Sequence, residues 1–520
     1  MALGRRGRRG LAAAAVAVAA AAVTVIILEL LPGGSGPAVV RLSAAPLGVN
    51  IAPWDGVYAG SGSSVIQPLL AAAGIKQIRY GGGSYADSYD WQTNTNIGNC
   101  LPDHPSASFT GGCASASQLS FSQLSARARA IGAESLVTVN YGSGTPALAA
   151  AWVTRAKNTA GEQVALWEVG NESYGCYEVN NRLADAPVHY QGYRPATGTA
   201  AGQDQTCPTT TQGQVAGTKT LATSYAANAL PFLRAMKAAD PTARLGVPWL
   251  LGTTTAAGSA GDGSVTASAA WNDTVLGTDG DYAGFVDAHY YPFFFSGATG
   301  GGNPTDAQVL AALRSIPALA SATVSELAAH DPGAELVIGE TAVSSATTTT
   351  ACTPVSAVFA AGDVLSWLAA GAQTVDWWDL NNYGNSTNSC TNPDWGFFTS
   401  AASPVPETAY YGYLLASALA KPGALLGPLT TSAPDDVLAF QSTLPGGAHA
   451  VALINLDTSA ARTATFSVPT GLTGTLRSSV YRAGTQNASN SNVVKGTTPA
   501  ASLASGITLP AESITVFQTQ

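Results

Sequence analysis

Charged residues are scarce in this sequence. Of its 520 residues only 11% are Asp, Glu, Lys or Arg, and 23 basic residues face 32 acidic ones. A nucleic-acid-binding protein needs a basic face, so the shortage of Lys and Arg argues against that class. Disorder requires low hydrophobicity, whereas 46% of these residues are hydrophobic. We therefore expect folded domains with large cores and no nucleic-acid partner.

The sequence also lacks the common signatures of metal and nucleotide enzymes. Its five histidines form no HExxH pair, its cysteines form no CxxC pair, and it contains no P-loop. The nearest approach to the Gly-x-Ser-x-Gly elbow of serine hydrolases, residues 82–86, ends in alanine. We therefore predict no metal and no cofactor.

The N-terminus has the pattern of an export segment. Four arginines within residues 5–9 precede residues 11–28, which carry no charge, and a Gly- and Pro-rich stretch follows. A signal-peptide core spans about 7–15 residues and a membrane helix roughly 20, so this length lies between the two. The sequence predicts that residues 1–36 are a signal peptide or, alternatively, a retained membrane anchor with a linker. Either way we expect the remaining chain to lie outside the cytoplasm, in contact with a membrane only through such an anchor.

Cysteine usage agrees with a secreted protein. An even number of cysteines in an exported chain indicates disulfide bonds. Sequential pairing places each bridge within one loop region, which favours it over the other pairings. The six cysteines would then form the bonds Cys100–Cys113, Cys176–Cys207 and Cys352–Cys390.

Short apolar runs alternate with helical patterns over most of the chain. Parallel strands joined by helices give this alternation, and eight of them favour a closed (β/α)8 TIM barrel, here over residues 44–420. Active sites of such barrels lie at the C-terminal ends of the strands. The predicted strands are 47–50, 75–80, 136–140, 164–170, 244–248, 285–290, 335–339 and 374–378. The predicted helices are 64–73, 118–131, 146–157, 224–238, 306–329, 358–370 and 408–420.

Residues 421–520 have a different character. Short apolar or alternating runs are separated by Gly, Pro, Asn and Thr, and no long helical pattern occurs. This pattern predicts a C-terminal antiparallel β-sandwich, to which residues 38–43 could add a strand. The runs are 437–440, 450–454, 464–468 and 513–517.

Glutamate is rare, and its positions are informative. Three of the 11 glutamates, Glu168, Glu172 and Glu340, lie in or just after predicted strands. A carboxylate in an apolar strand costs free energy unless it is paired or used. Glu172 and Glu340 follow the fourth and seventh strands, so both should point into the mouth of the barrel. Two such acids suit glycoside hydrolysis, whereas structural ion pairs are disfavoured because Lys and Arg are few.

The segments around these acids resemble known motifs. Residues 167–172, WEVGNE, are similar to the acid/base motif of retaining clan A glycoside hydrolases, and residues 338–340, IGE, to their nucleophile motif. Within the clan the chain resembles the family 51 α-L-arabinofuranosidases over roughly residues 46–420. Further similar segments are RYGGG at 79–83, YDW at 89–91, NYGSGT at 140–145 and HYY at 289–291.

Two departures leave the sugar open. Ser84 stands where the family 51 pattern has an asparagine, and residues 48–54 lack that family's glutamate. A β-xylosidase, a β-glucuronidase or an endo-glycanase on the same barrel remains an alternative. A non-catalytic carbohydrate-binding surface protein is a further alternative, which the presence of both motif glutamates disfavours.

The resemblance implies a retaining glycoside hydrolase, most similar to an α-L-arabinofuranosidase, that acts on plant or microbial polysaccharide or oligosaccharide, and the N-terminal segment predicts that it is secreted. Glu340 would be the nucleophile of a double displacement, and Glu172 the general acid and then the general base. Glu172 would need the higher pKa of the two acids. Asn171 would hydrogen-bond the sugar 2-OH.

The remaining candidate residues would bind or position. The resemblance implies that Arg79 and Tyr291 orient Glu340 and that His289 contacts the substrate or Glu172. Aromatic faces stack on sugar rings, and many tryptophans of this chain fall near predicted rim loops. Among these we expect Trp378 and Trp91 to contact substrate.

The cysteine pairing is directly testable. Peptide mapping of the exported protein under non-reducing conditions should recover three linked peptide pairs, one for each sequential bond. A peptide joining Cys176 to Cys352 would contradict the assignment, because it would connect two separate loop regions.

Overall fold

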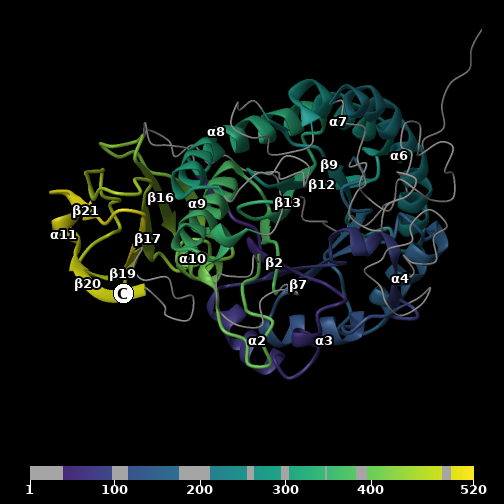
Figure 1. The fold of residues 1–520 in the computed structure, drawn as a ribbon, viewed down its shortest axis with the longest axis horizontal. Coiled ribbons are helices and arrows are strands. Elements are labelled where there is room, and N and C mark those ends of the chain that lie inside the picture. The colour runs from purple at the N-terminus through teal and green to yellow at the C-terminus, as the bar shows by residue number, and fades with distance from the viewer. Residues whose placement is uncertain are drawn as a thin grey trace, which may run out of the picture.

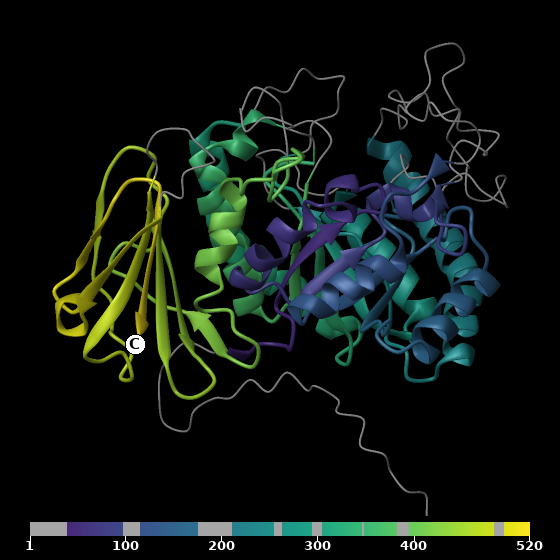
Figure 2. The same ribbon diagram turned by 90° about the horizontal axis from the view of Figure 1, so that it is seen from below.

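The structure is a computed structural model. It describes residues 39–96, 115–174, 211–253, 263–293, 304–345, 348–381, 395–482 and 493–520. A barrel and an antiparallel sheet lie side by side in it (Figures 1 and 2). The export segment, and five of the six cysteines, lie outside the described residues, as does the side chain of Cys352. The predicted export and disulfide pairing therefore stay predictions.

Eight parallel strands close into a barrel in chain order, the last pairing with the first. This confirms the TIM-barrel prediction, and each predicted strand overlaps an observed one. The strands are almost entirely buried, as expected when helices cover a barrel whose interior is filled by side chains. They are β2 (Leu47–Ile51), β3 (Gln77–Tyr80), β7 (Glu134–Val139), β8 (Leu166–Val169), β9 (Leu245–Trp249), β12 (Ala283–Tyr290), β13 (Glu335–Thr341) and β14 (Thr374–Trp377).

Helices surround the barrel, and local sequence sets several of their ends. Capping boxes, Ser120 with Gln123 and Thr305 with Gln308, start α3 and α8. Thr145 caps α4, which has proline at its first position. The helices are α1 (Gly56–Ala59), α2 (Ser63–Ala72), α3 (Phe121–Ile131), α4 (Pro146–Asn158), α6 (Thr211–Ala239), α7 (Val265–Asp279), α8 (Asp306–His330), α9 (Pro354–Ala370) and α10 (Thr408–Ala416).

Two helical segments escaped the sequence analysis. No helix is predicted over α7, and α6 begins 13 residues before the predicted start at residue 224. Both stretches are rich in Thr, Ser and Gly, which have poor helix propensity. Helices α6 and α7 pack against each other, so tertiary packing supplies the stability that local sequence does not.

Helix α8 is long and apolar enough to cross a membrane, by length and composition alone. In the structure it is a barrel helix that packs against α9. Its buried side chains recur at helical spacing: Val309, Leu310, Leu313, Ile316, Ala320, Thr323 and Leu327. The apolar composition is therefore explained by this packing.

The C-terminal residues form a sandwich, as predicted. A seven-stranded antiparallel sheet forms the layer beside the barrel. The outer layer of the sandwich consists of a two-stranded sheet, β18 (Arg462–Ala464) with β21 (Ile507–Leu509), and of α11 (Ala500–Leu503). The large sheet has the order β1 (Val40–Arg41), β15 (Leu425–Pro428), β16 (Val437–Thr443), β17 (His449–Asn455), β22 (Ser513–Thr519), β19 (Thr475–Arg482) and β20 (Val493–Pro499). The segment before the barrel thus adds one edge strand.

Both faces of the large sheet are buried near its centre. Along β17, Val451 and Leu453 join the core of the sandwich, whereas Ala452 and Ile454 join the core shared with the barrel. This is the two-residue period of a strand. Strands β19 and β20 were not predicted, because most of their residues are polar and exposed or half-exposed and the alternation is weak.

Candidate active site

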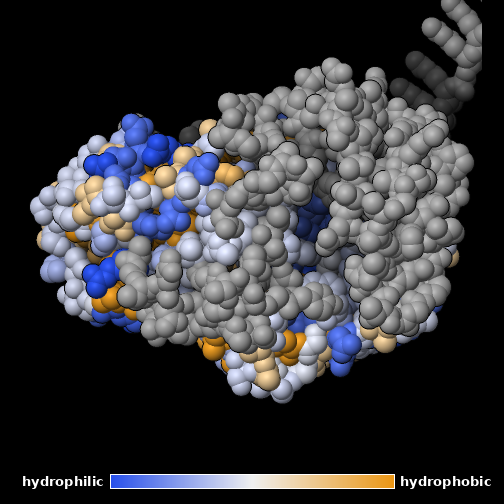
Figure 3. All heavy atoms as spheres, in the orientation of Figure 1, coloured by the Kyte–Doolittle hydropathy of each residue, from blue (hydrophilic) through white to orange (hydrophobic). Residues whose placement is uncertain are grey.

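A cluster of charged side chains lies at the C-terminal ends of the barrel strands. Arg79 comes from β3, Asp287 and His289 from β12, Glu340 from β13, and Glu172 follows β8. Hydrophilic residues are visible in a hollow over the centre of the barrel, near β12 and β13 (Figure 3). The barrel therefore carries a polar centre where its strands end.

Arg79 connects most of this cluster. Its guanidinium is buried and donates through Nη1 to Glu340 Oε1 (2.7 Å) and through Nη2 to Glu168 Oε2 (2.9 Å) and Asn171 Oδ1 (2.8 Å). Its Nε donates to Asp287 Oδ2 at 3.2 Å. Burial alone would lower the pKa of Arg79, but the neighbouring carboxylates raise it well above its usual value. Arg79 is therefore a permanent cation that binds three acids.

Glu340 is held by donors on both carboxyl oxygens. Besides the ion pair with Arg79, Oε2 accepts from the Tyr291 hydroxyl at 2.7 Å and lies 3.5 Å from His289 Nδ1. Burial raises the pKa of Glu340, and His289 and Arg79 only partly offset this. The structure thus places Arg79 and Tyr291 against Glu340 and fixes the direction of its carboxyl group.

Glu172 lies opposite, just beyond the end of β8. Its Oε1 is 2.8 Å from His289 Nδ1 and accepts from the Tyr174 hydroxyl at 3.2 Å. One carboxyl oxygen of Glu172, one of Glu340 and one ring nitrogen of His289 all lie within 4.8 Å of one another. The backbone of Glu172 has φ 39°, in the left-handed region, which suggests a functional constraint.

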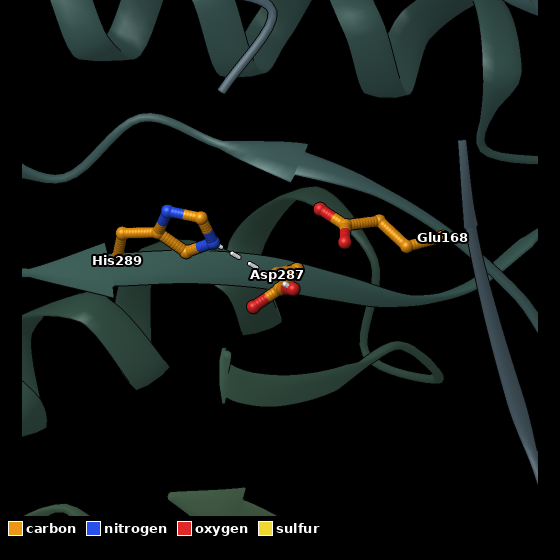
Figure 4. Close-up of side chains that lie close together, drawn as sticks. All are labelled: Glu168, Asp287 and His289. Atoms are coloured by element: carbon orange, nitrogen blue, oxygen red, sulfur yellow. Dashed lines mark ion pairs between the residues drawn. The ribbon is translucent and has the colours of Figure 1, made fainter. Parts of the chain in front are cut away.

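His289 stands between the two acids. Burial would lower its pKa, but Glu340, Asp287 and Glu172 raise it well above the usual value. Asp287 and His289 project from the same face of β12, and the Glu168 carboxyl reaches toward them from β8 (Figure 4). His289 therefore carries a positive charge between Glu172 and Glu340.

The backbone beside Glu340 is clamped from two sides. The Gly339 N–H donates to Asp287 Oδ1 (2.7 Å), and its carbonyl accepts from Asn50 Nδ2 (2.7 Å). A Cβ at position 339 would lie 2.2 Å from both Asp287 carboxyl oxygens, so only glycine fits. The motif glycine therefore allows a buried acid to hold the strand next to Glu340.

Asp87 holds the backbone at Asn171 in a similar way. It is fully buried and accepts three backbone N–H groups, those of Tyr141 (3.2 Å), Gly142 (3.2 Å) and Asn171 (3.1 Å). Burial raises the pKa of Asp87 to about 7, against the lowering effect of these donors. One carboxyl group thus joins the loops that follow β3, β7 and β8.

The two candidate tryptophans lie in different surroundings. Trp378 is partly buried at the end of β14. Its backbone N–H donates to Thr341 O (2.9 Å), and its ring lies over Gly83. Trp91 instead stacks on Trp152 of α4, with ring centroids 5.5 Å apart, and its Nε1 donates to Leu148 O. The structure therefore puts Trp378 near the cluster and gives Trp91 a packing position on α4.

Sequence reasoning assigned no role to Asp287, Asn50 or Asp87 and gave Glu168 no partner, although all four complete this site. Asp287 could have been found, because it lies two positions before His289 and must share its face of the strand. Glu168 was noticed as a costly buried acid, but its partner was not. Asn50 and Asp87 gave no signal, since their roles depend on backbone groups from distant loops.

Two sets of side chains have a spacing that could hold a metal ion: Glu168 with Asp287 and His289, and Glu172 with His289 and Glu340. In the first set Arg79 donates to both carboxylates. In the second set it pairs with Glu340. The Arg79 guanidinium thus supplies the positive charge that a metal ion would bring to these carboxylates.

No family model matches the sequence, and no curated protein matches it. Solved structures do match its fold. An α-L-arabinofuranosidase from Thermotoga maritima, solved as an arabinose complex, is 14% identical with a TM-score of 0.63, covering 92% of this chain and 97% of that one. A 4-O-α-L-rhamnosyl-β-D-glucuronidase from Fusarium oxysporum 12S is 16% identical with a TM-score of 0.56, covering 92% and 97%. A family 39 β-xylosidase from Caulobacter crescentus is 14% identical with a TM-score of 0.53, covering 92% and 98%. These matches confirm, at the level of the fold, the resemblance to clan A glycosidases.

Asp87→Ala should destabilise the protein and reduce its activity. The substitution leaves three buried N–H groups without their acceptor, at about 1–3 kcal/mol for an unsatisfied group, so we expect a loss of at least ~2 kcal/mol in urea unfolding. Displacing Asn171 and Glu172 by about 1 Å should cost roughly 10²-fold in turnover. Asp90→Ala, which removes an acid from an exposed turn, is the control. Equal stability of the Asp87 and Asp90 variants would contradict this role.

Proposed function

We propose that this protein is a retaining glycoside hydrolase. The observation that carries the proposal is the separation of Glu172 and Glu340, whose carboxyl oxygens approach within 4.8 Å. Retaining enzymes hold their two acids about 5–5.5 Å apart, whereas inverting enzymes need roughly 6.5–9.5 Å to admit a water molecule. A nearest oxygen–oxygen distance within 4.8 Å agrees with the closer, retaining arrangement, and we therefore propose double displacement.

In this mechanism Glu340 is the nucleophile. Arg79 and Tyr291 donate to its two oxygens and stabilise the ionised form. The carboxylate attacks the anomeric carbon, the glycosidic bond breaks, and Glu172 gives its proton to the departing oxygen. Water then attacks the glycosyl-enzyme while Glu172 takes up a proton, which restores both acids.

Neighbouring groups orient these acids. His289 lies between them and contacts Glu172, so a movement of either acid would break a contact in the cluster. Arg79 fixes the Asn171 side chain by donating to its carbonyl oxygen, an orientation suited to a hydrogen bond with the sugar 2-OH. The partly buried Trp378 ring offers a face for a sugar next to Glu340.

The substrate we propose is an α-L-arabinofuranoside. The T. maritima structure, one of several arabinofuranosidases among the matches, supports this choice. The charges of the site support an uncharged sugar, since Arg79 and His289, the cations of the cluster in the described chain, are already paired with carboxylates. We further propose that the enzyme is secreted, on the strength of residues 1–36.

The two acids should respond differently to substitution. Glu340→Gln removes the nucleophile, so hydrolysis should fall by several orders of magnitude even for activated aryl glycosides. Glu172→Ala removes the acid and base, so an activated substrate should still form the glycosyl-enzyme but release it slowly. Azide needs no base and should restore turnover of Glu172→Ala, giving a glycosyl azide of retained configuration. Glu326→Gln, on helix α8, is the control. Near wild-type activity of Glu340→Gln would contradict the assignment.

A panel of aryl glycosides tests the sugar and the stereochemistry together. The 4-nitrophenyl α-L-arabinofuranoside should be cleaved faster than the β-D-xyloside, β-D-glucuronide and β-D-glucoside, and NMR of the first product should show retained configuration. Faster cleavage of another member would replace the proposed sugar while keeping the mechanism. Inversion would refute the mechanism.

A further inference from the structure

Two buried acids share one edge of the Arg79 guanidinium. Glu168 Oε2 lies 2.9 Å from Nη2 and 3.3 Å from Nε, and Asp287 Oδ2 lies 3.2 Å from the same Nε. Both acid side chains have 0% of their surface exposed. Like charges this close and this dry cannot both be fully ionised at low cost. One proton is therefore expected on the pair.

The hydrogen bonds indicate which acid holds it. Both oxygens of Asp287 face donors, Gly339 N on Oδ1 and Arg79 Nε on Oδ2. On Glu168 the donors gather on Oε2, which also accepts from Thr138 Oγ1 at 2.7 Å. Its Oε1 is buried and has no partner among the described residues. A buried oxygen without a donor costs more on an ionised carboxylate than on a neutral carboxyl group, so this environment favours the neutral form of Glu168.

We propose that Glu168 is uncharged in the folded protein and that it acts as a positioning residue for Glu340 through Arg79. Glu168 contacts Arg79 and Thr138 in this cluster and not the two acids that would react. The positioning role of Glu168 rests on the proposed function, whereas its protonation state is independent of that function.

The pKa directions of Glu168 and Asp287 agree with this assignment. Burial raises the pKa of Glu168 to about 8, although Arg79 opposes this. Burial would also raise the pKa of Asp287, but Arg79 and His289 outweigh it and bring the pKa below the usual value. The titratable and charged groups that face Glu168 are Arg79 of β3, Asp287 and His289 of β12, and more remotely Tyr225 of α6.

A neutral Glu168 balances the charges of the site. With Glu172 protonated, as its role in the proposed mechanism requires, Arg79 and His289 are then matched by Asp287 and an ionised Glu340, one negative charge for each positive one. An ionised Glu168 would compete with Glu340 for the same guanidinium. Because a neutral Glu168 attracts Arg79 less strongly, the charge of Arg79 acts mainly on Glu340 and Asp287.

The pH dependence of stability tests the protonation state without any substrate. The folded pKa of Glu168 lies above the value of about 4.3 expected in the unfolded chain. The resulting stabilisation is fully present below pH ~4 and is lost as pH rises through about 8. Glu168→Gln keeps the shape and cannot ionise, so its Tm should fall less than that of the wild type between pH 5 and pH 9.

The control is Glu326→Gln, a partly exposed acid on α8, whose Tm should follow the wild type at every pH. If the Glu168→Gln and wild-type curves were parallel, Glu168 would not gain a proton on folding and the proposal would be overturned. This outcome is independent of whether the protein cleaves any glycoside.

Activity tests the positioning role, because Glu168→Leu leaves Arg79 Nη2 without this acceptor and should lower kcat, whereas Glu168→Gln keeps an acceptor there and should restore it. With a neutral Glu168, the acid limb of the kcat/KM profile of Glu168→Gln should stay within about 0.3 pH units of the wild type, since a one-unit shift would correspond to a lost charge interaction. Asp287→Asn removes a real charge and should move that limb. A shift of one unit or more in Glu168→Gln would overturn the proposal. If the wild type cleaved no glycoside in the panel, the proposed function would fail, and with it the positioning role, while the Tm curves would still decide the protonation state.

Discussion

The site depends on one buried cation. Arg79 brings a permanent positive charge into the barrel, and acids from three other strands close around it. An unpaired guanidinium would be very costly to bury, so these acids and the arginine require one another. Because each acid is anchored in a strand, the ion pairs also set the relative positions of the strand ends. The direction of the Glu340 carboxyl group follows from this arrangement.

A second set of interactions acts on the backbone. Asp287 and Asn50 hold Gly339 beside Glu340, and Asp87 holds Asn171 beside Glu172. In both places a buried polar side chain binds the main chain next to a reacting acid. This arrangement restricts the acids through their backbones while leaving their carboxyl groups at the mouth of the barrel. Rigid positioning of this kind is what a mechanism with two precisely spaced acids requires.

The seventh strand also connects the site to the outer layers. Thr341, the residue after Glu340, donates to the buried Asp363 of α9 at 2.9 Å, and Trp367 Nε1 donates to the same carboxyl group. Burial raises the pKa of Asp363 to about 8, against the lowering effect of these two donors. Helix α9 packs in turn against strands of the large C-terminal sheet. The sandwich therefore supports the wall of the barrel behind the strand that carries Glu340.

The barrel and the C-terminal sandwich could be predicted from the sequence alone, and the two acids of the proposed mechanism were picked out there as candidates. Strand alternation and rare glutamates at strand ends are local features, and they remain visible without a structure. The contacts between these side chains became known from the fold. Asp87 binds backbone from two other loops, Asp287 shares Arg79 with Glu168, and Trp91 packs on α4. Helix α7 and strands β19 and β20 likewise form through packing rather than local pattern. The physical reason is the same in each case, because a buried hydrogen bond or ion pair joins residues whose distance along the chain says nothing about their distance in space.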